Sequence, residues 1–326
     1  MRIIIPEDYQ QAVRGLDCFS RLQGHDVVVL DQPLHGLEQN AEALAGAEAL
    51  VLIRERTQVD AALLAGLPQL RLISQTGRLS SNIDIEACTR HGVAVAEGSG
   101  SPVAPAELAW ALVMAASRRL RAYGDALHAG RWQATGDALL GRALHGRTLG
   151  IWSYGKIGRL VAGYGRAFGM RVMVWGGEAS CAQARADGFE VARSRAHLFA
   201  ESDVLSLHRR LSDASRHEVG AADLALMRPD ALLVNTSRAE LIAPGALLAA
   251  LDAGRPGMAA LDVFEHEPLL DANDPLLRHP RMLATPHLGY VERDSYEQYF
   301  SAAFDNVLAF AAGTPRHIAN PQVLEG

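Results

Sequence analysis

Short apolar runs alternate with amphipathic stretches along the whole chain. In the first 99 residues, runs typical of buried strands occupy 2–5, 26–30, 49–53, 70–74 and 93–96. Helical periodicity lies between them, for instance over 9–22 and 83–90. Because strands that alternate with helices form parallel sheets, these residues predict an α/β domain.

The composition changes at 98–105, where Gly-Ser-Gly-Ser-Pro-Val-Ala-Pro reads as a hinge. Ser101 is a candidate N-cap and Pro102 suits a first helical position, so we expect one long alanine-rich helix over 106–123. Its small residues suit close packing, either as a bridge between two domains or against another subunit.

The alternation then resumes, which predicts a second α/β domain in a chain of 326 residues. Strands are expected at 149–152, 171–175, 189–192, 203–208, 231–237, 258–264 and 282–285. Helices are expected at 157–168, 195–200, 222–227 and 244–253. The chain order of a last amphipathic helix, 291–311, favours its return to the first domain.

Residues 148–178 predict a strand–helix–strand unit with a glycine-bearing turn, Ser-Tyr-Gly-Lys-Ile-Gly, over 153–158. Gly155 leaves the backbone accessible to a pyrophosphate, and Gly158 allows the helix to pack close to the strand. The helix start offers free N–H groups and a partial positive charge. Ser153 replaces the first glycine of the dinucleotide motif, so an ordinary tight turn stays as the alternative.

Charge and composition exclude several classes of function. A net charge of −6 argues against a nucleic-acid-binding surface, and 49% hydrophobic with 21% charged residues is ordinary for a globular enzyme. Cys18, Cys88 and Cys181 have no metal or redox spacing, which indicates a reducing compartment. We find no signal peptide and no uncharged apolar run of membrane-spanning length. We therefore expect a cytoplasmic protein with no nucleic-acid or membrane partner.

Polar residues follow four of the predicted strands. The runs at 234–240, 261–268 and 284–290 are Val-Asn-Thr-Ser-Arg-Ala-Glu, Leu-Asp-Val-Phe-Glu-His-Glu-Pro and Ala-Thr-Pro-His-Leu-Gly-Tyr. In the loop 74–81, Gly77 can expose backbone N–H groups and Arg78 can face an anion. A plain glycine turn with a solvated arginine explains that loop equally well. Open α/β sheets bind ligands at such strand ends.

In combination, these motifs resemble the D-isomer-specific 2-hydroxyacid dehydrogenases, the family of D-3-phosphoglycerate, glycerate and hydroxypyruvate dehydrogenases. The resemblance rests on 147–151 with Gly155 and Gly158, on 167–170, on 206–208 and on the three polar strand ends. It implies two doubly wound parallel-sheet α/β domains. A Rossmann NAD(P)-binding domain, 100–287, is inserted into a flavodoxin-like substrate domain, 1–99 with 288–326, and the active site lies in the cleft between them.

The resemblance implies a catalytic arginine, glutamate and histidine, which fall on Arg238, Glu267 and His287. A guanidinium can bind the carboxylate of a 2-oxo acid with a planar fork. The alkoxide left by hydride transfer needs a proton, which an imidazolium near neutral pH supplies, and a neighbouring carboxylate stabilises that cation. In the oxidation direction His287 acts as the base.

The resemblance also implies an NAD site and a substrate site. Asp262 corresponds to an aspartate near the nicotinamide carboxamide, whereas His208 lies either near the cofactor or in a structural hydrogen bond. Glu265-His266-Glu267 looks like a ligand run, but neighbours in an extended chain face opposite sides, so no metal is expected. The expected cofactor contacts are Ser153, Tyr154, Gly155, Lys156, Ile157, Gly176, Glu178, His208, Thr236, Ser237, Arg238, Asp262, His287 and Gly289, and the expected substrate contacts are Thr76, Gly77, Arg78, Arg238 and His287.

The sequence departs from the family pattern at several positions. Gly176 stands where the family has the aspartate that binds the ribose diol; Glu178 could replace it, or could be a solvated surface residue. NAD is the expected cofactor, and NADP stays open. Ala239 and Tyr290 replace glycines, and Tyr290 adds bulk that could shape substrate choice.

The expected activity is hydride transfer between NAD(P)H and a 2-oxo acid, forming a D-2-hydroxy acid. Alternatives are a non-catalytic NAD(H)-sensing protein on the same scaffold, or a family member acting on phosphite or formate. The expected partners are the small-molecule acid and a second copy, as a homodimer through the nucleotide-binding domain. The sequence leaves the particular acid and the physiological direction open.

Overall fold

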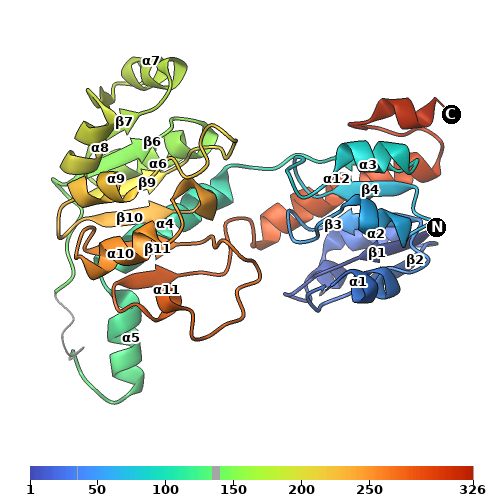
Figure 1. The fold of residues 1–326 in the computed structure, drawn as a ribbon, viewed down its shortest axis with the longest axis horizontal. Coiled ribbons are helices and arrows are strands. Elements are labelled where there is room, and N and C mark those ends of the chain that lie inside the picture. The colour runs from blue at the N-terminus through green and yellow to red at the C-terminus, as the bar shows by residue number, and fades with distance from the viewer. Residues whose placement is uncertain (35, 134–139, 326) are drawn as a thin grey trace. The chain divides into compact units, whose positions relative to one another are not determined.

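The computed structural model of the protein describes residues 1–34, 36–133 and 140–325 (Figure 1). Contacts divide the chain into two compact units. Unit 1 comprises Met1–Ser101 and Val291–Gly326, and unit 2 comprises Pro102–Tyr290. The sequence predicted domain boundaries after residues 99 and 287. In the structure the two boundaries follow Ser101 and Tyr290, a few residues later.

Unit 1 is built on a five-stranded parallel sheet in the order β2-β1-β3-β4-β5, which is the flavodoxin-like order. The strands are β1 (Arg2–Ile5), β2 (Asp26–Val29), β3 (Ala49–Leu52), β4 (Leu72–Gln75) and β5 (Ala94–Glu97). Ile3, Ile4 and Ile5 are fully buried, because a parallel sheet covered on both faces has no solvent side.

Helices cover both faces of this sheet. Residues of the second and third helices pack with Leu50, Leu52 and Ile73 in one core. The last helix packs on β4, where the hydroxyl of Ser74 donates to the carbonyl of Ala303 at 2.9 Å. The helices are α1 (Leu37–Ala43), α2 (Ala61–Ala65), α3 (Ile85–Arg90) and α12 (Arg293–Ala311), with 3-10 segments at Val13–Gly15, Asp17–Leu22 and Pro321–Leu324.

The expectation of one helix over 9–22 was wrong, since the structure has two 3-10 segments there. Gln11 takes a left-handed conformation with φ of 51°, which interrupts any helix. The Asp8 carboxylate accepts the N–H groups of Ala12 and Val13, so local side-chain bonds start the first 3-10 segment instead.

Unit 2 has a seven-stranded parallel sheet in the order β12-β11-β10-β9-β6-β7-β8. The order reverses between β6 and β9, as in the Rossmann fold, and this reversal marks the usual ligand position. The strands are β6 (Thr148–Trp152), β7 (Arg171–Trp175), β8 (Glu190–Val191), β9 (Val204–Leu207), β10 (Leu232–Asn235), β11 (Met258–Leu261) and β12 (Met282–Ala284).

Each face of this sheet has its own core, because side chains alternate along a strand. Leu149 and Ile151 of β6 belong to one core, whereas Trp152 belongs to the other, packed edge-on against Phe199. The helices of the unit are α4 (Val103–Ser117), α5 (Leu120–His128), α6 (Lys156–Ala167), α7 (Glu178–Ala186), α8 (Arg195–Glu201), α9 (Ala221–Leu226), α10 (Ala246–Asp252) and α11 (Pro275–Arg278), with a 3-10 segment at Ala239–Leu241.

The expected single helix over 106–123 is two helices. α4 begins at Val103, directly after Pro102, and ends at Ser117; Arg119 is left-handed with φ of 51° and α5 follows. The carbonyl of Ser117 accepts the N–H of Arg142 at 2.7 Å, so the returning chain takes an acceptor of the last turn. Within the described ranges, no helix combines the length and the apolar character needed to cross a bilayer.

Candidate active site

The turn after β6 leaves its backbone accessible. Ser153 takes the first glycine position of the motif in a left-handed conformation, with φ of 74°, and its N–H donates to the carbonyl of Trp175 at 2.7 Å. A Cβ built on Gly155 would meet no atom within 4 Å. The serine therefore preserves the sharp turn, and space stays open where a pyrophosphate would lie.

α6 starts directly against this turn. A Cβ on Gly158 would lie 2.3 Å from the carbonyl oxygen of Ser153, so only glycine permits the approach. The first N–H bonded within the helix is that of Arg159, which donates to Gly155 at 3.0 Å. The N–H groups of Lys156 and Ile157 precede it and point out of the helix start. The turn thus fits the phosphates of a dinucleotide, since both space and donors are present.

The side chain of Tyr154 is directed into the protein. Its ring packs against Phe189 with centroids 5.8 Å apart, and its hydroxyl donates to Asp187 at 2.8 Å. Burial and this bond to a carboxylate raise the pKa of Tyr154 to about 12, so the hydroxyl stays protonated. Any contact of Tyr154 with the cofactor is limited to its backbone.

The end of β7 carries no fixed acid. A Cβ on Gly176 would lie 3.2 Å from the Cβ of Ser180 and 3.4 Å from the Cα of Ser153, so a side chain there would be tightly confined. Glu178 is exposed at the first position of α7. Its carboxylate is the acidic group closest in sequence to the end of the strand.

His208 lies just beyond β9, next to β6, where its N–H donates to the carbonyl of Trp152 at 2.9 Å. Its Nε2 is 2.9 Å from the hydroxyl oxygen of Ser206. Burial lowers the pKa of His208 from 6.5 to about 4, so the ring is neutral at pH 7. The structural hydrogen bond considered for this residue is present, and a cofactor contact stays a prediction.

The loop after β10 holds Thr236, Ser237 and Arg238 in half-buried positions. The hydroxyl of Ser237 donates to the carbonyl of Leu207 at 2.8 Å, and the Asn235 side chain bonds the carbonyl of Arg238 at 2.8 Å. The guanidinium of Arg238 donates to the carbonyl of Ser237 at 2.6 Å. The backbone that carries the arginine is therefore fixed on both sides.

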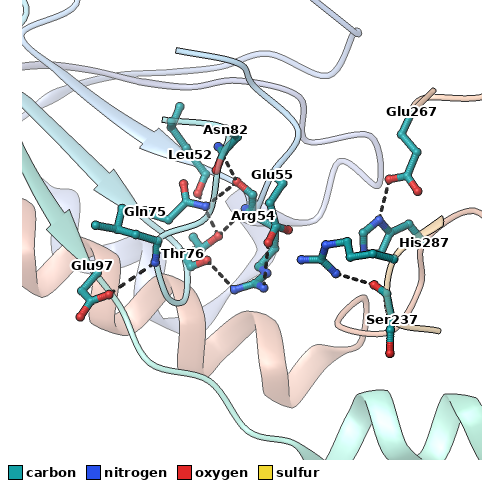
Figure 2. Close-up of polar contacts among 12 residues, drawn as sticks. Leu52, Arg54, Glu55, Gln75, Thr76, Asn82, Glu97, Ser237, Glu267 and His287 are labelled. Atoms are coloured by element: carbon teal, nitrogen blue, oxygen red, sulfur yellow. Dashed lines mark hydrogen bonds and ion pairs between the residues drawn. The ribbon is translucent and has the colours of Figure 1, made fainter. Parts of the chain in front are cut away.

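His287 and Glu267 form the closest titratable pair of the site (Figure 2). Nδ1 of His287 lies 2.6 Å from Oε2 of Glu267, and because a carboxylate only accepts, Nδ1 carries the proton. The other oxygen of Glu267 accepts the N–H of Phe264 at 2.9 Å. Nε2 of the imidazole is thus left for chemistry, and the carboxylate compensates a positive charge on the ring.

Asp262 holds the backbone around His287, which is left-handed with φ of 53°. One carboxylate oxygen accepts the Thr285 hydroxyl and the Leu288 N–H, both at 2.7 Å, and the other accepts the Gly289 N–H at 2.9 Å. Burial raises the pKa of Asp262, although these hydrogen bonds oppose the shift. Both oxygens serve the histidine loop, a function that the sequence alone did not indicate.

Strand register brings these three loops to one edge of the sheet. Asn235 pairs with Leu261, and Leu261 pairs with Ala284, so the loops that follow β10, β11 and β12 are neighbours. Arg238, Asp262 and His287 each stand within three residues of these paired positions. They share this edge with the glycine turn.

In unit 1, the loop after β4 is packed rather than open (Figure 2). The Thr76 hydroxyl donates to the carbonyl of Leu52 and accepts the N–H of Arg54, both at 2.8 Å. A Cβ on Gly77 would clash with the Arg54 guanidinium, which lies against the glycine. Arg78 is exposed. The hydroxyl of Thr76 therefore has a structural function, and the substrate contacts predicted for this loop stay predictions.

Sequence reasoning missed three contacts near these loops. They join Tyr154 to Asp187, Tyr290 to the ring of His287, and Arg54 to Gly77. Only the second had a sequence signal, because a tyrosine stands where the family has glycine. In the described ranges, no three histidine, cysteine, aspartate or glutamate side chains gather as a metal site.

Comparison with known proteins identifies the family. Residues 110–289 match the family model of the D-isomer-specific 2-hydroxyacid dehydrogenase NAD-binding domain. A glyoxylate reductase from Aeropyrum pernix is 38% identical over 275 residues, 82% of each chain. The crystal structure of an oxidoreductase from Ralstonia solanacearum has a TM-score of 0.97 and 56% identity, covering 99% of this chain and 98% of that one. A phosphoglycerate oxidoreductase from Vibrio cholerae has a TM-score of 0.94 and 55% identity, covering 96% and 99%.

These matches confirm the expected fold class, the NAD(H) cofactor and the oxidoreductase activity. The glycine turn agrees with them, since it offers space and donors for a dinucleotide. The chain belongs to the D-isomer-specific 2-hydroxyacid dehydrogenase family and is an NAD-dependent 2-hydroxyacid oxidoreductase.

Proposed function

We propose that the protein interconverts a 2-oxo acid and a D-2-hydroxy acid, with His287 as the acid/base, Glu267 as its partner and Arg238 as the substrate anchor. The observation that carries this proposal is the 2.6 Å contact between Nδ1 of His287 and Glu267. It fixes the tautomer, so that Nε2 is the atom that exchanges a proton with the substrate oxygen.

Glu267 stabilises the imidazolium from which the proton leaves. The side chains are only partly exposed, His287 to 22% and Glu267 to 34%, so water screens the pair less than it would on an open surface. In the reduction direction Nε2–H protonates the developing alkoxide, and in the oxidation direction neutral Nε2 removes the hydroxyl proton.

Arg238 binds the substrate carboxylate in this proposal. Its backbone is fixed by Asn235, and its guanidinium can present two parallel N–H groups to a carboxylate. That contact would place the neighbouring carbonyl carbon in a defined position. Lysine offers no such planar fork, so the two cations are not equivalent here.

NAD(H), when bound, supplies or accepts the hydride. We propose that the turn from Ser153 to Ile157 binds its phosphates through backbone N–H groups, with Gly158 allowing the close approach. The remaining proposed contacts are Gly176, Glu178, His208, Thr236, Ser237, Arg238, Asp262, His287 and Gly289. Glu178 is the proposed acceptor for the ribose hydroxyls, since it is exposed and is the acid closest in sequence to the end of β7.

The proposed substrate is a small 2-oxo acid, and similar proteins bear the names glyoxylate reductase and phosphoglycerate oxidoreductase. We assign cofactor binding to unit 2 and substrate recognition to unit 1, where Thr76, Gly77 and Arg78 are the proposed contacts. The free thiols Cys18, Cys88 and Cys181 support a reducing compartment, for which we propose the cytoplasm.

We also propose a homodimer formed through unit 2. Leu120 and Leu127 on α5 are 58% and 57% exposed, and Trp132 beyond it is 76% exposed. Leu120 and Leu127 are seven residues apart, so they lie on one face of α5, and exposed apolar side chains on one helix face are typical of an interface. Sedimentation equilibrium tests this, and a monomer at micromolar concentration would contradict it.

The function is tested by comparing His287→Ala with His266→Ala, a matched control at an exposed position next to Glu267. We expect His287→Ala to lower kcat for 2-oxo acid reduction by at least ~100-fold, as for loss of a general acid, while the Kd for NADH changes little. His266→Ala should behave as wild type. Equal turnover in the two variants would refute the assignment.

A further inference from the structure

Tyr290 lies directly beside the proposed acid/base. The two rings meet in a T-shaped arrangement, with centroids 5.6 Å apart and planes at 73°. Tyr290 is only 6% exposed, and it follows Gly289, whose N–H is held by Asp262 at 2.9 Å. The tyrosine ring is therefore anchored on the same clamped loop as the imidazole.

The imidazole needs more than one contact to be held in a single orientation. The hydrogen bond to Glu267 fixes Nδ1, but a ring held at one atom can still tilt about that contact. The bonds of Asp262 fix the backbone, and they leave the side-chain torsions free. The contact with the Tyr290 ring limits the tilt of the imidazole plane, because edge-to-face packing has a preferred geometry.

We propose that Tyr290 is a positioning residue for the reaction, whose aromatic ring keeps Nε2 of His287 aimed at the substrate oxygen. The inference rests on the proposed function, since it assumes that His287 transfers the proton. Small displacements at a reacting atom reduce rates strongly, so the ring should affect turnover more than cofactor binding.

A purely structural function of Tyr290 predicts a different result. A buried aromatic that only fills the core would lower the stability of unit 2 when truncated, and the remaining folded protein would keep its kcat. A positioning function predicts a lower kcat in fully folded protein. The two are separated by the variants Tyr290→Phe, which keeps the ring, and Tyr290→Leu, which removes it.

Tyr164→Leu is the matched control, because Tyr164 also packs against an aromatic of unit 2, Trp110, with centroids 6.1 Å apart. We expect Tyr290→Leu to lower kcat for 2-oxo acid reduction ~10-fold or more, with the Kd for NADH within about twofold of wild type. Tyr290→Phe, which keeps the ring, should retain at least about half of the wild-type kcat. Tyr164→Leu should leave kcat unchanged.

Proton NMR of the cofactor-free protein gives a readout that does not depend on turnover. The short hydrogen bond between Nδ1 and Glu267 should give a downfield proton signal, identified by its loss in Glu267→Gln. We expect this signal in wild type and Tyr290→Phe, and expect it broadened or absent in Tyr290→Leu.

A wild-type kcat in folded Tyr290→Leu would overturn the inference. A kcat of Tyr290→Phe as low as that of Tyr290→Leu would overturn it as well. A failure of the proposed function looks different, because His287→Ala would then be as active as wild type. If His287→Ala is inactive while Tyr290→Leu is fully active, only the positioning function of Tyr290 is wrong.

Discussion

The carboxylate of Asp262 accepts the hydroxyl of Thr285 at 2.7 Å, two residues before His287. The same carboxylate accepts the two N–H groups that follow the histidine, those of Leu288 and Gly289. One fully buried acid at the end of β11 thereby binds the Thr285 side chain before His287 and the backbone after it. The left-handed conformation of the histidine is maintained by this clamp.

Asp262→Asn should therefore disturb the histidine loop. The amide nitrogen of asparagine donates rather than accepts, so at least one of the three donors bound by Asp262 loses its partner, at a cost of about 1–3 kcal/mol in the free energy of unfolding. We expect a lower urea midpoint and a kcat reduced by at least ~10-fold. Asp213→Asn, at an exposed position, is the control. Wild-type kcat in Asp262→Asn would show that the clamp is dispensable.

Gly158→Ala should separate α6 from the glycine turn. The added Cβ would lie 2.3 Å from the carbonyl of Ser153, so the helix must shift and its N–H groups leave the phosphate position. We expect the Kd for NADH to rise by at least ~10-fold in fluorescence titration. Gly163 lies in the same helix, and a Cβ added there would meet no atom within 4 Å. The control Gly163→Ala should therefore stabilise the protein by about 0.5–1 kcal/mol. Identical NADH affinity in the two variants would contradict the argument.

Tyr154→Phe removes only the hydroxyl that joins the turn to Asp187. The loss of one hydrogen bond to a charged group should cost about 1.5–3 kcal/mol of stability. Because the turn is then held less firmly, the KM for NADH should rise while kcat changes little. Tyr296→Phe is the matched control, because it also removes a tyrosine hydroxyl that donates a hydrogen bond, in this case to Gln10 in unit 1 at 2.9 Å. An increase in the KM for NADH of the same size in both variants would show that the effect is not local to the turn.

His208 should make stability depend on pH. Its pKa is about 4 in the folded protein and 6.5 in a model peptide, so the unfolded chain binds a proton first as pH falls. The stabilisation is fully present above pH 6.5 and is lost as pH falls toward 4. Relative to His208→Gln, the wild-type free energy of unfolding should fall by about 2 kcal/mol between pH 7 and pH 5 in urea titrations. Parallel pH profiles of wild type and His208→Gln would mean that the imidazole contributes nothing to this pH dependence.

The sequence identified most strands, because buried parallel strands read as short apolar runs. The run 171–175 is β7 without change, and 258–264 contains β11. Helices were harder to predict when local bonds compete with them. In the segment 9–22, hydrogen bonds to the Asp8 side chain favour a 3-10 segment. In the segment 106–123, the left-handed conformation of Arg119 separates two helices. Hydrophobic periodicity indicates neither feature.

For the site, the sequence by itself determined which chemical groups are present and the order in which strands carry them. The glycine turn follows from its own spacing, whereas Arg238, Glu267 and His287 were predicted from the family resemblance, at strand ends that parallel strands bring to one edge. Only the tertiary structure decided how these groups are held. The bond of Tyr154 to Asp187, the clamp of Asp262 and the ring contact of Tyr290 depend on side-chain directions and on strand register. Packing of the whole chain sets both, and residue spacing does not encode them.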